Sequence, residues 1–328
     1  MASGASPVGV VIGVDIGGTK VAAGLVDSSG EILRHNRVPM NTESETAALA
    51  SVTGAIEAVS AQASISSANA QILGIGICSP GPLDPRAGVV INPPNLPCWR
   101  NFPLATEISR THRVPVRVDN DANAAGLAEG LWGAARGFRN VFYATFGTGV
   151  GTAVLIGGTI YHGRTGAAAE GGHMSINFEG PECGCGKRGC IEAYAAGPAI
   201  ALRARAKLES GRSSGMLELA HGKPEQINSF MVAEALASGD PVAREVLSET
   251  IELIACWLGN VVDLLEPDVM VVGGGVSSML NPHLGEIQDR LPRYSLNQRC
   301  CEIPLVPARY GEDSGIAGGA ALCFASPQ

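Results

Sequence analysis

The sequence predicts an α/β protein built from two related domains that face one another across a cleft. Runs rich in Val and Ile alternate with longer Ala-rich stretches of helical periodicity, which is typical of layered strands and helices. A strand, a Gly/Thr turn and a second strand occur at residues 10–27 and again at residues 140–156. Two such hairpins, about 130 residues apart, indicate an internal duplication.

In the first half of the chain we expect five strands and two helices. Three strands joined by short Gly-containing turns are expected to pair antiparallel. We expect strands at residues 8–16, 20–27, 31–39, 71–78 and 114–119, a helix at 45–63, and a helix that starts near residue 122. In the second half we expect strands at 140–146, 150–156 and 268–272, helices between 196 and 266 with breaks at 211–215 and 239–241, and a closing helix at 313–324.

Length and composition limit the function classes. A chain of 328 residues can form two domains with their own cores, and 45% apolar with 16% charged residues is typical of a globular protein. A net charge of −8 argues against nucleic acid as the main partner. No apolar run reaches the ~18 residues of a membrane helix, and residues 1–7 lack the positive charge that begins a signal peptide.

Cysteine usage predicts a reducing compartment and a metal site. Nine cysteines is an odd number, and six of them are scattered, as expected of free thiols in the cytoplasm. His173, Cys183, Cys185 and Cys190 form a Cys3His set within eighteen residues, and glycines between them allow the backbone to fold inward. We expect a closed, structural Zn²⁺ site rather than incidental cysteines, since a disulfide between Cys183 and Cys185 would be strained.

Two Gly/Thr turns are candidate phosphate-binding loops. Glycines let backbone N–H groups approach phosphate oxygens, and Thr and Lys side chains add a hydroxyl and a charge. Asp15 at a strand end could hold a Mg²⁺-bound water. A further turn, Gly273-Gly274-Gly275, could lie against the base or ribose of a nucleotide, or could simply join a strand to a helix. The candidate residues are Asp15, Gly17, Gly18, Thr19 and Lys20, then Thr145, Gly147, Thr148 and Gly149, with Gly273, Gly274 and Gly275.

Polar clusters indicate where a hydroxyl group could react. Residues 119–123 (Asp-Asn-Asp-Ala-Asn) stand where a strand enters an Ala-rich helix. An N-cap explains one polar residue but not four, and a carboxylate there is well placed to take a proton from an alcohol. Glu170 and Glu192 flank the metal loop, which would hold them rigidly for hydrogen bonds from sugar hydroxyls; surface exposure is the usual alternative for Glu.

The motifs together resemble the ROK family of sugar kinases and repressors, over about residues 8–325. They are DIGGTK at 15–20, SPGPLD at 79–84, VDNDANAA at 118–125, TFGTGVG at 145–151, EGGH at 170–173, CGCGKRGCIE at 183–192 and VVGGGVS at 271–277. The resemblance implies two actin-like (ribonuclease H-like) ATPase domains flanking a cleft. The smaller would span residues 8–121, completed by a helix at about 311–325, and the larger would span 122–310 with the zinc loop at 173–190.

The resemblance also implies roles for individual residues. Asp121 would be the general base, and His173 would use one ring nitrogen for zinc and the other for the sugar. The implied substrate-binding set is Gly81, Asn95, Asn120, Asp121, Glu170, His173 and Glu192. ATP, Mg²⁺ and structural Zn²⁺ are the expected cofactors. A hexose and ATP are the expected partners, without nucleic acid or membrane, and the protein is expected to form a homodimer or homotetramer.

The sequence thus predicts an ATP-dependent hexose kinase, a glucokinase that phosphorylates O6 of glucose. Kinases for N-acylmannosamine, N-acetylglucosamine, fructose or allose are alternatives within the family, and polyphosphate is an alternative donor. A sugar-sensing regulator is the alternative from another class. The resemblance favours the kinase branch, because the repressors carry an N-terminal helix-turn-helix domain and only about seven residues precede the first strand here.

Overall fold

The computed structural model describes residues 9–66, 71–209 and 211–325. Contacts within the chain group the residues in two compact units. The first unit comprises Met1–Arg139, Ala153–Ala169 and Arg309–Gln328, and the second comprises Asn140–Thr152 and Glu170–Ala308. The domain limits expected at residues 121 and 310 stay a prediction, and Val8, the expected start of the first strand, lies outside the described residues.

Five strands of the first unit form one sheet in the order β3-β2-β1-β4-β7. They are β1 (Gly9–Ile16), β2 (Lys20–Asp27), β3 (Ile32–Pro39), β4 (Gln71–Ser79) and β7 (Val116–Asn120), beside a separate short pair, β5 (Leu83–Asp84) and β6 (Val89–Val90). β1, β2 and β3 pair antiparallel, as their short turns predict, whereas β4 and β7 run parallel to β1. The carboxyl ends of β1, β4 and β7 therefore meet at one edge of the sheet, where Asp15 pairs with Cys78 and Cys78 with Asp119.

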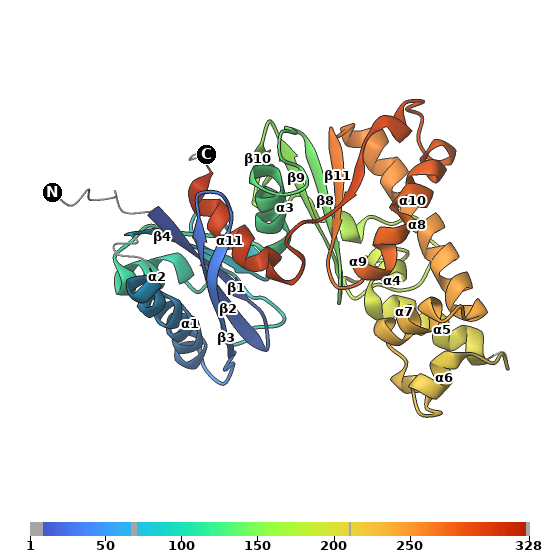
Figure 1. Ribbon diagram of the computed structural model, residues 1–328, viewed down its shortest axis with the longest axis horizontal. Helices are drawn as coiled ribbons and strands as arrows, with labels where there is room; N and C mark the ends of the chain where they lie inside the picture. Colours follow the sequence, from blue (N-terminus) through green and yellow to red (C-terminus); the bar gives the residue numbers. More distant parts are fainter. Residues whose placement is uncertain (1–8, 67–70, 210, 326–328) are drawn as a thin grey trace. The chain divides into compact units, whose positions relative to one another are not determined.

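Helices bury both faces of this sheet. They are α1 (Glu45–Ser66), α2 (Leu104–His112), α3 (Asp121–Leu131) and α11 (Ser314–Phe324). Alternate residues of β1 face opposite layers: Val10 and Ile12 join the core that includes residues of α1, and Val11 joins the core that includes residues of α11. Figure 1 shows α1 and α11 on opposite sides of the sheet.

The closing helix α11 lies unusually near the strands beneath it. A Cβ atom on Gly13 would lie 1.8 Å from the carbonyl oxygen of Ile316, and one on Gly76 would lie 1.8 Å from that of Gly319. Only glycine permits this approach of helix backbone to strand backbone. The segment that precedes α11 is held by the buried carboxylate of Glu129 in α3. Oε1 of Glu129 accepts a hydrogen bond from the backbone N–H of Arg309 at 2.8 Å.

A second five-stranded sheet has the order β10-β9-β8-β11-β12. Its strands are β8 (Val141–Phe146), β9 (Val150–Ile156), β10 (Thr159–Ile160), β11 (Val269–Gly273) and β12 (Leu305–Pro307). β11 runs parallel to both β8 and β12, and β10 runs antiparallel to β9. The two sheets have the same strand order. If the strands of each sheet are numbered 1 to 5 along the chain, the order across the sheet is 3-2-1-4-5 in both, and strands 4 and 5 run parallel to strand 1. The predicted duplication is therefore confirmed at the level of topology.

Helices make up most of the second unit. The α-helices are α4 (Glu192–Ala195), α5 (Gly197–Glu209), α6 (Gly215–Leu219), α7 (Ser229–Ala237), α8 (Pro241–Leu265), α9 (Ser277–Leu280) and α10 (Leu284–Arg290). Short 3-10 turns span Gly171–His173, Pro224–Gln226, Asn281–His283, Leu291–Arg293, Cys300–Glu302 and, in the first unit, Gly311–Asp313. The predicted break at 239–241 is confirmed: Asp240 caps α8 by accepting from the N–H groups of Val242 and Ala243, with Pro241 in the first turn.

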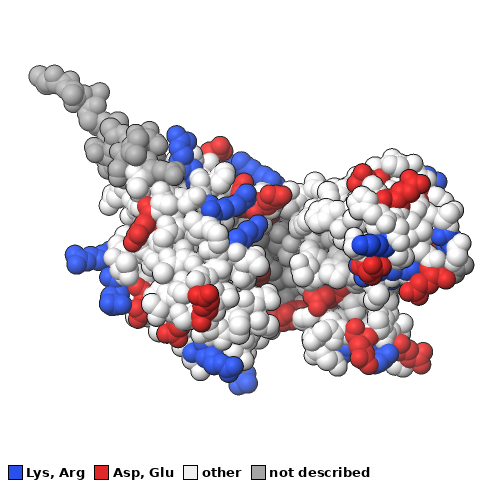
Figure 2. Space-filling view, turned by 90° about the horizontal axis from the view of Figure 1, so that it is seen from below, with Lys and Arg blue, Asp and Glu red and all other residues white. Residues whose placement is uncertain are grey.

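The surface carries both signs of charge. On the face seen in Figure 2, acidic and basic side chains are interspersed over the described residues. Among the helices described, none combines the length and apolar character needed to cross a membrane.

Candidate active site and metal centre

The turn between β7 and α3 presents two of the predicted site residues. Asn120 ends the strand and caps the helix, since its Oδ1 accepts from the N–H groups of Ala122 at 2.9 Å and Asn123 at 3.3 Å. Asp121 is the first helical residue and is exposed. Its Oδ1 accepts from Ala122 N at 2.8 Å. The N-terminus of a helix favours a negative charge, so this position suits a carboxylate that must act as a base.

Asp15 lies at the same edge of the sheet, at the end of β1. The pKa of Asp15 is raised from the usual 3.8 to about 6, first by burial and then by the negative charge of Asp121, while the cations Lys20 and Arg37 oppose the change. The structure therefore brings Asp15 and Asp121 close enough for their charges to interact. In α/β sheets with parallel strands, ligands bind beyond the carboxyl ends of the strands.

Other predicted residues of the first unit lie around this edge. The β1–β2 turn closes through a hydrogen bond from Gly17 N to the carbonyl oxygen of Lys20 at 2.9 Å. A Cβ on Gly18 would lie 2.9 Å from the carbonyl oxygen of Asn95, so the candidate phosphate turn packs on the candidate sugar-binding segment. A Cβ on Gly81 would lie 3.8 Å from Nδ2 of Asn120. Thr19 and Lys20 are exposed at the turn.

In the second unit, the two predicted glycine turns are neighbours. Residue 273 at the end of β11 pairs with Thr145 of β8. Gly274 has a φ of +90°, and a Cβ there would lie 2.4 Å from the carbonyl oxygen of Phe146. The turn that contains Thr148 closes through Gly147 N and the carbonyl oxygen of Gly149 at 2.9 Å. Glycine is therefore required where these backbones meet, and Gly275 has open space around it.

His173, Cys183, Cys185 and Cys190 converge, as the spacing predicts. Their possible ligand atoms all lie within 4.8 Å of one another. Sγ of Cys185 is 3.7 Å from Sγ of Cys190, and Sγ of Cys183 is 3.7 Å from Nδ1 of His173. Sulfur atoms 2.3 Å from a tetrahedral zinc would lie about 3.8 Å apart, so the donor set fits a zinc ion. Nδ1 of His173 faces the cluster, which leaves Nε2 on the other side of the ring.

The two glutamates of the metal loop have different surroundings. Glu170 is exposed and precedes the 3-10 turn that carries His173. Glu192 begins α4, and its Oε2 accepts from the backbone N–H of Val150 at 2.9 Å, while Oε1 lies 3.7 Å from Nδ1 of His173. Glu192 thus connects the metal loop to the β8–β9 hairpin. The sequence did not predict this contact, because Glu192 and Val150 are 42 residues apart.

These features define an actin-like α/β fold of the kind found in ATP-dependent sugar kinases. The family model described as ROK family matches residues 11–325. The chain belongs to this family.

Relatives within the family include enzymes for more than one sugar. The chain is 34% identical to a glucokinase of Streptomyces coelicolor over 317 residues, 96% of this chain and 97% of the relative. It is 30% identical to an N-acetyl-D-glucosamine kinase of Yersinia pseudotuberculosis, over 95% of this chain and 98% of the relative. Among solved structures, a ROK family glucokinase of Streptomyces griseus in complex with glucose and AMPPNP matches with a TM-score of 0.81 and 32% identity, over 95% of this chain and 98% of that chain.

Proposed function

We propose that this protein is an ATP-dependent hexose kinase, a glucokinase that transfers the γ-phosphoryl group of ATP to O6 of glucose. The observation that carries the proposal is the pair of carboxylates at one sheet edge, Asp121 at the N-terminus of α3 and Asp15 at the end of β1. The similarity to glucokinases over nearly the whole chain supports it. One carboxylate suits the sugar hydroxyl and the other suits the metal ion of the nucleotide.

In this proposal Asp121 accepts the proton of the attacking hydroxyl. Hydroxyl groups of the sugar would be held by hydrogen bonds. The residues that we propose for this role are Gly81, Asn95, Asn120, Glu170, Glu192 and His173, the last through Nε2. Phosphoryl transfer needs little covalent chemistry from the protein, so positioning of the hydroxyl and neutralisation of phosphate charge supply most of the rate.

ATP would be held by backbone N–H groups of the two Gly/Thr turns and by Lys20, with residues 273–275 beside the nucleoside. Asp15 fits the water shell of a Mg²⁺ ion, which would neutralise charge on the phosphates when bound. The Cys3His cluster fits a structural Zn²⁺ that fixes the loop carrying Glu170 and Glu192. None of the nine cysteines, all of which the structure describes, forms a disulfide, which suits an enzyme of the reducing cytoplasm. We propose a homodimer or homotetramer, which light scattering of the purified protein would measure.

A coupled assay with ATP over glucose, mannose, fructose, N-acetylglucosamine and N-acetylmannosamine tests the proposal. We expect the highest kcat/KM with glucose. A preference for an N-acyl sugar would overturn the glucokinase assignment and leave the kinase mechanism in place, whereas activity with polyphosphate alone would change the donor. Phosphorylation of none of the sugars would refute the proposed function.

Asp121→Asn tests the base directly. The amide keeps the oxygen that accepts from Ala122 N, so the turn should keep its shape while the base is lost. We expect kcat to fall by roughly 10²- to 10⁴-fold, with sugar binding retained in calorimetry. Glu57→Gln, which changes an exposed carboxylate of α1, is the control. An Asp121→Asn enzyme with more than about half of the wild-type kcat would remove Asp121 from this role.

A further inference from the structure

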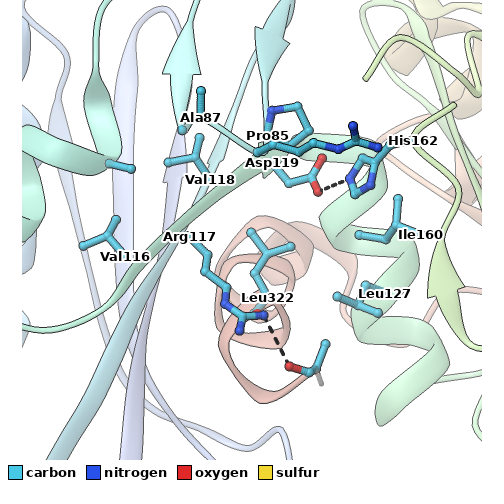
Figure 3. Close-up of a pocket in the computed structure, with 14 residues that line it drawn as sticks. Pro85, Ala87, Val116, Arg117, Val118, Asp119, Leu127, Ile160, His162 and Leu322 are labelled. Carbon is cyan, nitrogen blue, oxygen red and sulfur yellow. Dashed lines mark hydrogen bonds and ion pairs between the residues drawn. The ribbon is translucent and has the colours of Figure 1, made fainter. Parts of the chain in front are cut away.

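A buried carboxylate next to the proposed base is paired with a histidine from a distant part of the chain. Asp119, the penultimate residue of β7, is 3% exposed. Its Oδ2 lies 2.6 Å from Nε2 of His162, which follows β10. A carboxylate only accepts hydrogen bonds, so Nε2 of His162 is the donor. Figure 3 shows the two side chains facing each other.

The other oxygen of Asp119 holds the turn that carries the site. Oδ1 accepts from the backbone N–H of Asn120 at 2.7 Å and from Nδ2 of Asn123 at 3.1 Å. The first of these donors stands one residue before Asp121 in the sequence, and the second stands two residues after it. A buried carboxylate stays in place only while donors compensate for its lost hydration. Asp119 therefore accepts from one distant residue, His162, and from two groups of the β7–α3 turn, the backbone N–H of Asn120 and the side-chain amide of Asn123.

We propose that His162 is a positioning residue, which acts through Asp119 to hold the Asn120–Asp121 turn in its reactive place. The inference rests on the proposed function. His162 fixes one oxygen of Asp119, and Asp119 then fixes the first turn of α3 from its other oxygen. Loss of the histidine leaves a buried charge without its strongest donor, and the turn must move to rehydrate or rebond it. A displacement of about 1 Å can cost on the order of 10²-fold in rate.

The pair also lines a cavity of about 530 Å³ in the first unit. Arg117 of β7, Leu127 of α3, Ile160 of β10 and Leu322 of α11 form other parts of its wall (Figure 3). The cavity is large enough for an imidazole molecule. Removing the side chain of His162 would join the vacated space to this cavity, which gives a small molecule a route to Asp119.

The experiment compares His162→Ala, His162→Gln and the control His35→Ala, whose histidine is exposed on β3. For His162→Ala we expect kcat with the preferred sugar to fall roughly 10- to 100-fold, with a smaller change in the KM for ATP. The amide of glutamine can donate to Asp119, so His162→Gln should keep more activity than His162→Ala. Imidazole in the buffer should raise kcat of His162→Ala and leave the wild type unchanged.

Hydrogen exchange of residues 116–125 provides a readout that needs no catalysis. We expect faster exchange in His162→Ala and its reversal by imidazole. Two results would overturn the proposal. One is a wild-type kcat in His162→Ala. The other is a loss of kcat in both His162 variants that imidazole does not restore and that accompanies a general loss of thermal stability. A wild type that phosphorylates no hexose would refute the proposed function, while the exchange measurement would still test the positioning pair.

Discussion

Replacing Asp15 by asparagine should make the protein more stable and inactive. Asp15 is the carboxylate that we assign to the metal ion of the nucleotide, and burial raises its pKa from 3.8 to about 6. A group whose pKa is higher in the folded state contributes stability below its unfolded pKa and loses that contribution as the pH rises through the folded value. Above pH 6, ionised Asp15 therefore costs folding free energy.

The size of the cost follows from the two pKa values. The difference between 3.8 and about 6 corresponds to about 3 kcal/mol. The asparagine of Asp15→Asn does not ionise. The free energy of unfolding of the variant should therefore exceed that of the wild type by nearly zero below pH 3.8, by an intermediate amount at pH 5 and by the largest amount above pH 6. Urea unfolding at pH 5 and pH 7.5 measures this dependence, with the exposed carboxylate variant Glu57→Gln as the control. Equal stability of Asp15→Asn and wild type at pH 7.5 would refute the reasoning.

Three further changes have expected outcomes. Cys185→Ser should lose its bound zinc, as measured by metal analysis, and should lose activity with it. The wild type should release zinc as the pH falls, because zinc binds thiolates and not thiols. Active enzyme without zinc would contradict this prediction. A Cβ on Gly315 would lie 2.3 Å from Cγ of Asp15, so Gly315→Ala should displace the carboxylate by about 1 Å and lower kcat/KM for ATP on the order of 10²-fold. Gly54, inside α1, has nothing near its Cβ position, so Gly54→Ala should raise the free energy of unfolding by about 1 kcal/mol.

Local sequence signals were sufficient for the longer strands and for the metal cluster. The Gly-Gly-Thr turn after Ile16 predicted the first hairpin, and the spacing of Cys183, Cys185 and Cys190 predicted that their side chains converge. Their information lies within a few residues, where turn geometry and ligand chemistry decide the outcome. The helix α2 was not predicted, although Leu104 and Ile108 have helical spacing and are both buried.

Contacts between distant segments could not be read from the sequence. Asp119 and His162 are 43 residues apart, and neither belongs to a pattern that distinguishes a pair from two unrelated residues. Only the sheet order and the loop after β10 bring them together. The same holds for β12, because a strand of three residues has too few alternations to produce a periodic signal and forms where β11 offers a free edge.

The position of α11 has a consequence for synthesis on the ribosome. The first unit needs residues 309–325 to cover one face of its sheet, and these are translated after every residue of the second unit. Domains usually fold in the order in which they emerge. In this chain the amino-terminal strands must wait with Val11, Ala22 and Val26 uncovered until α11 arrives. The second unit can complete its fold first. A chaperone that shields apolar surface would therefore have to bind the amino-terminal strands for the longest time, although they are synthesised first.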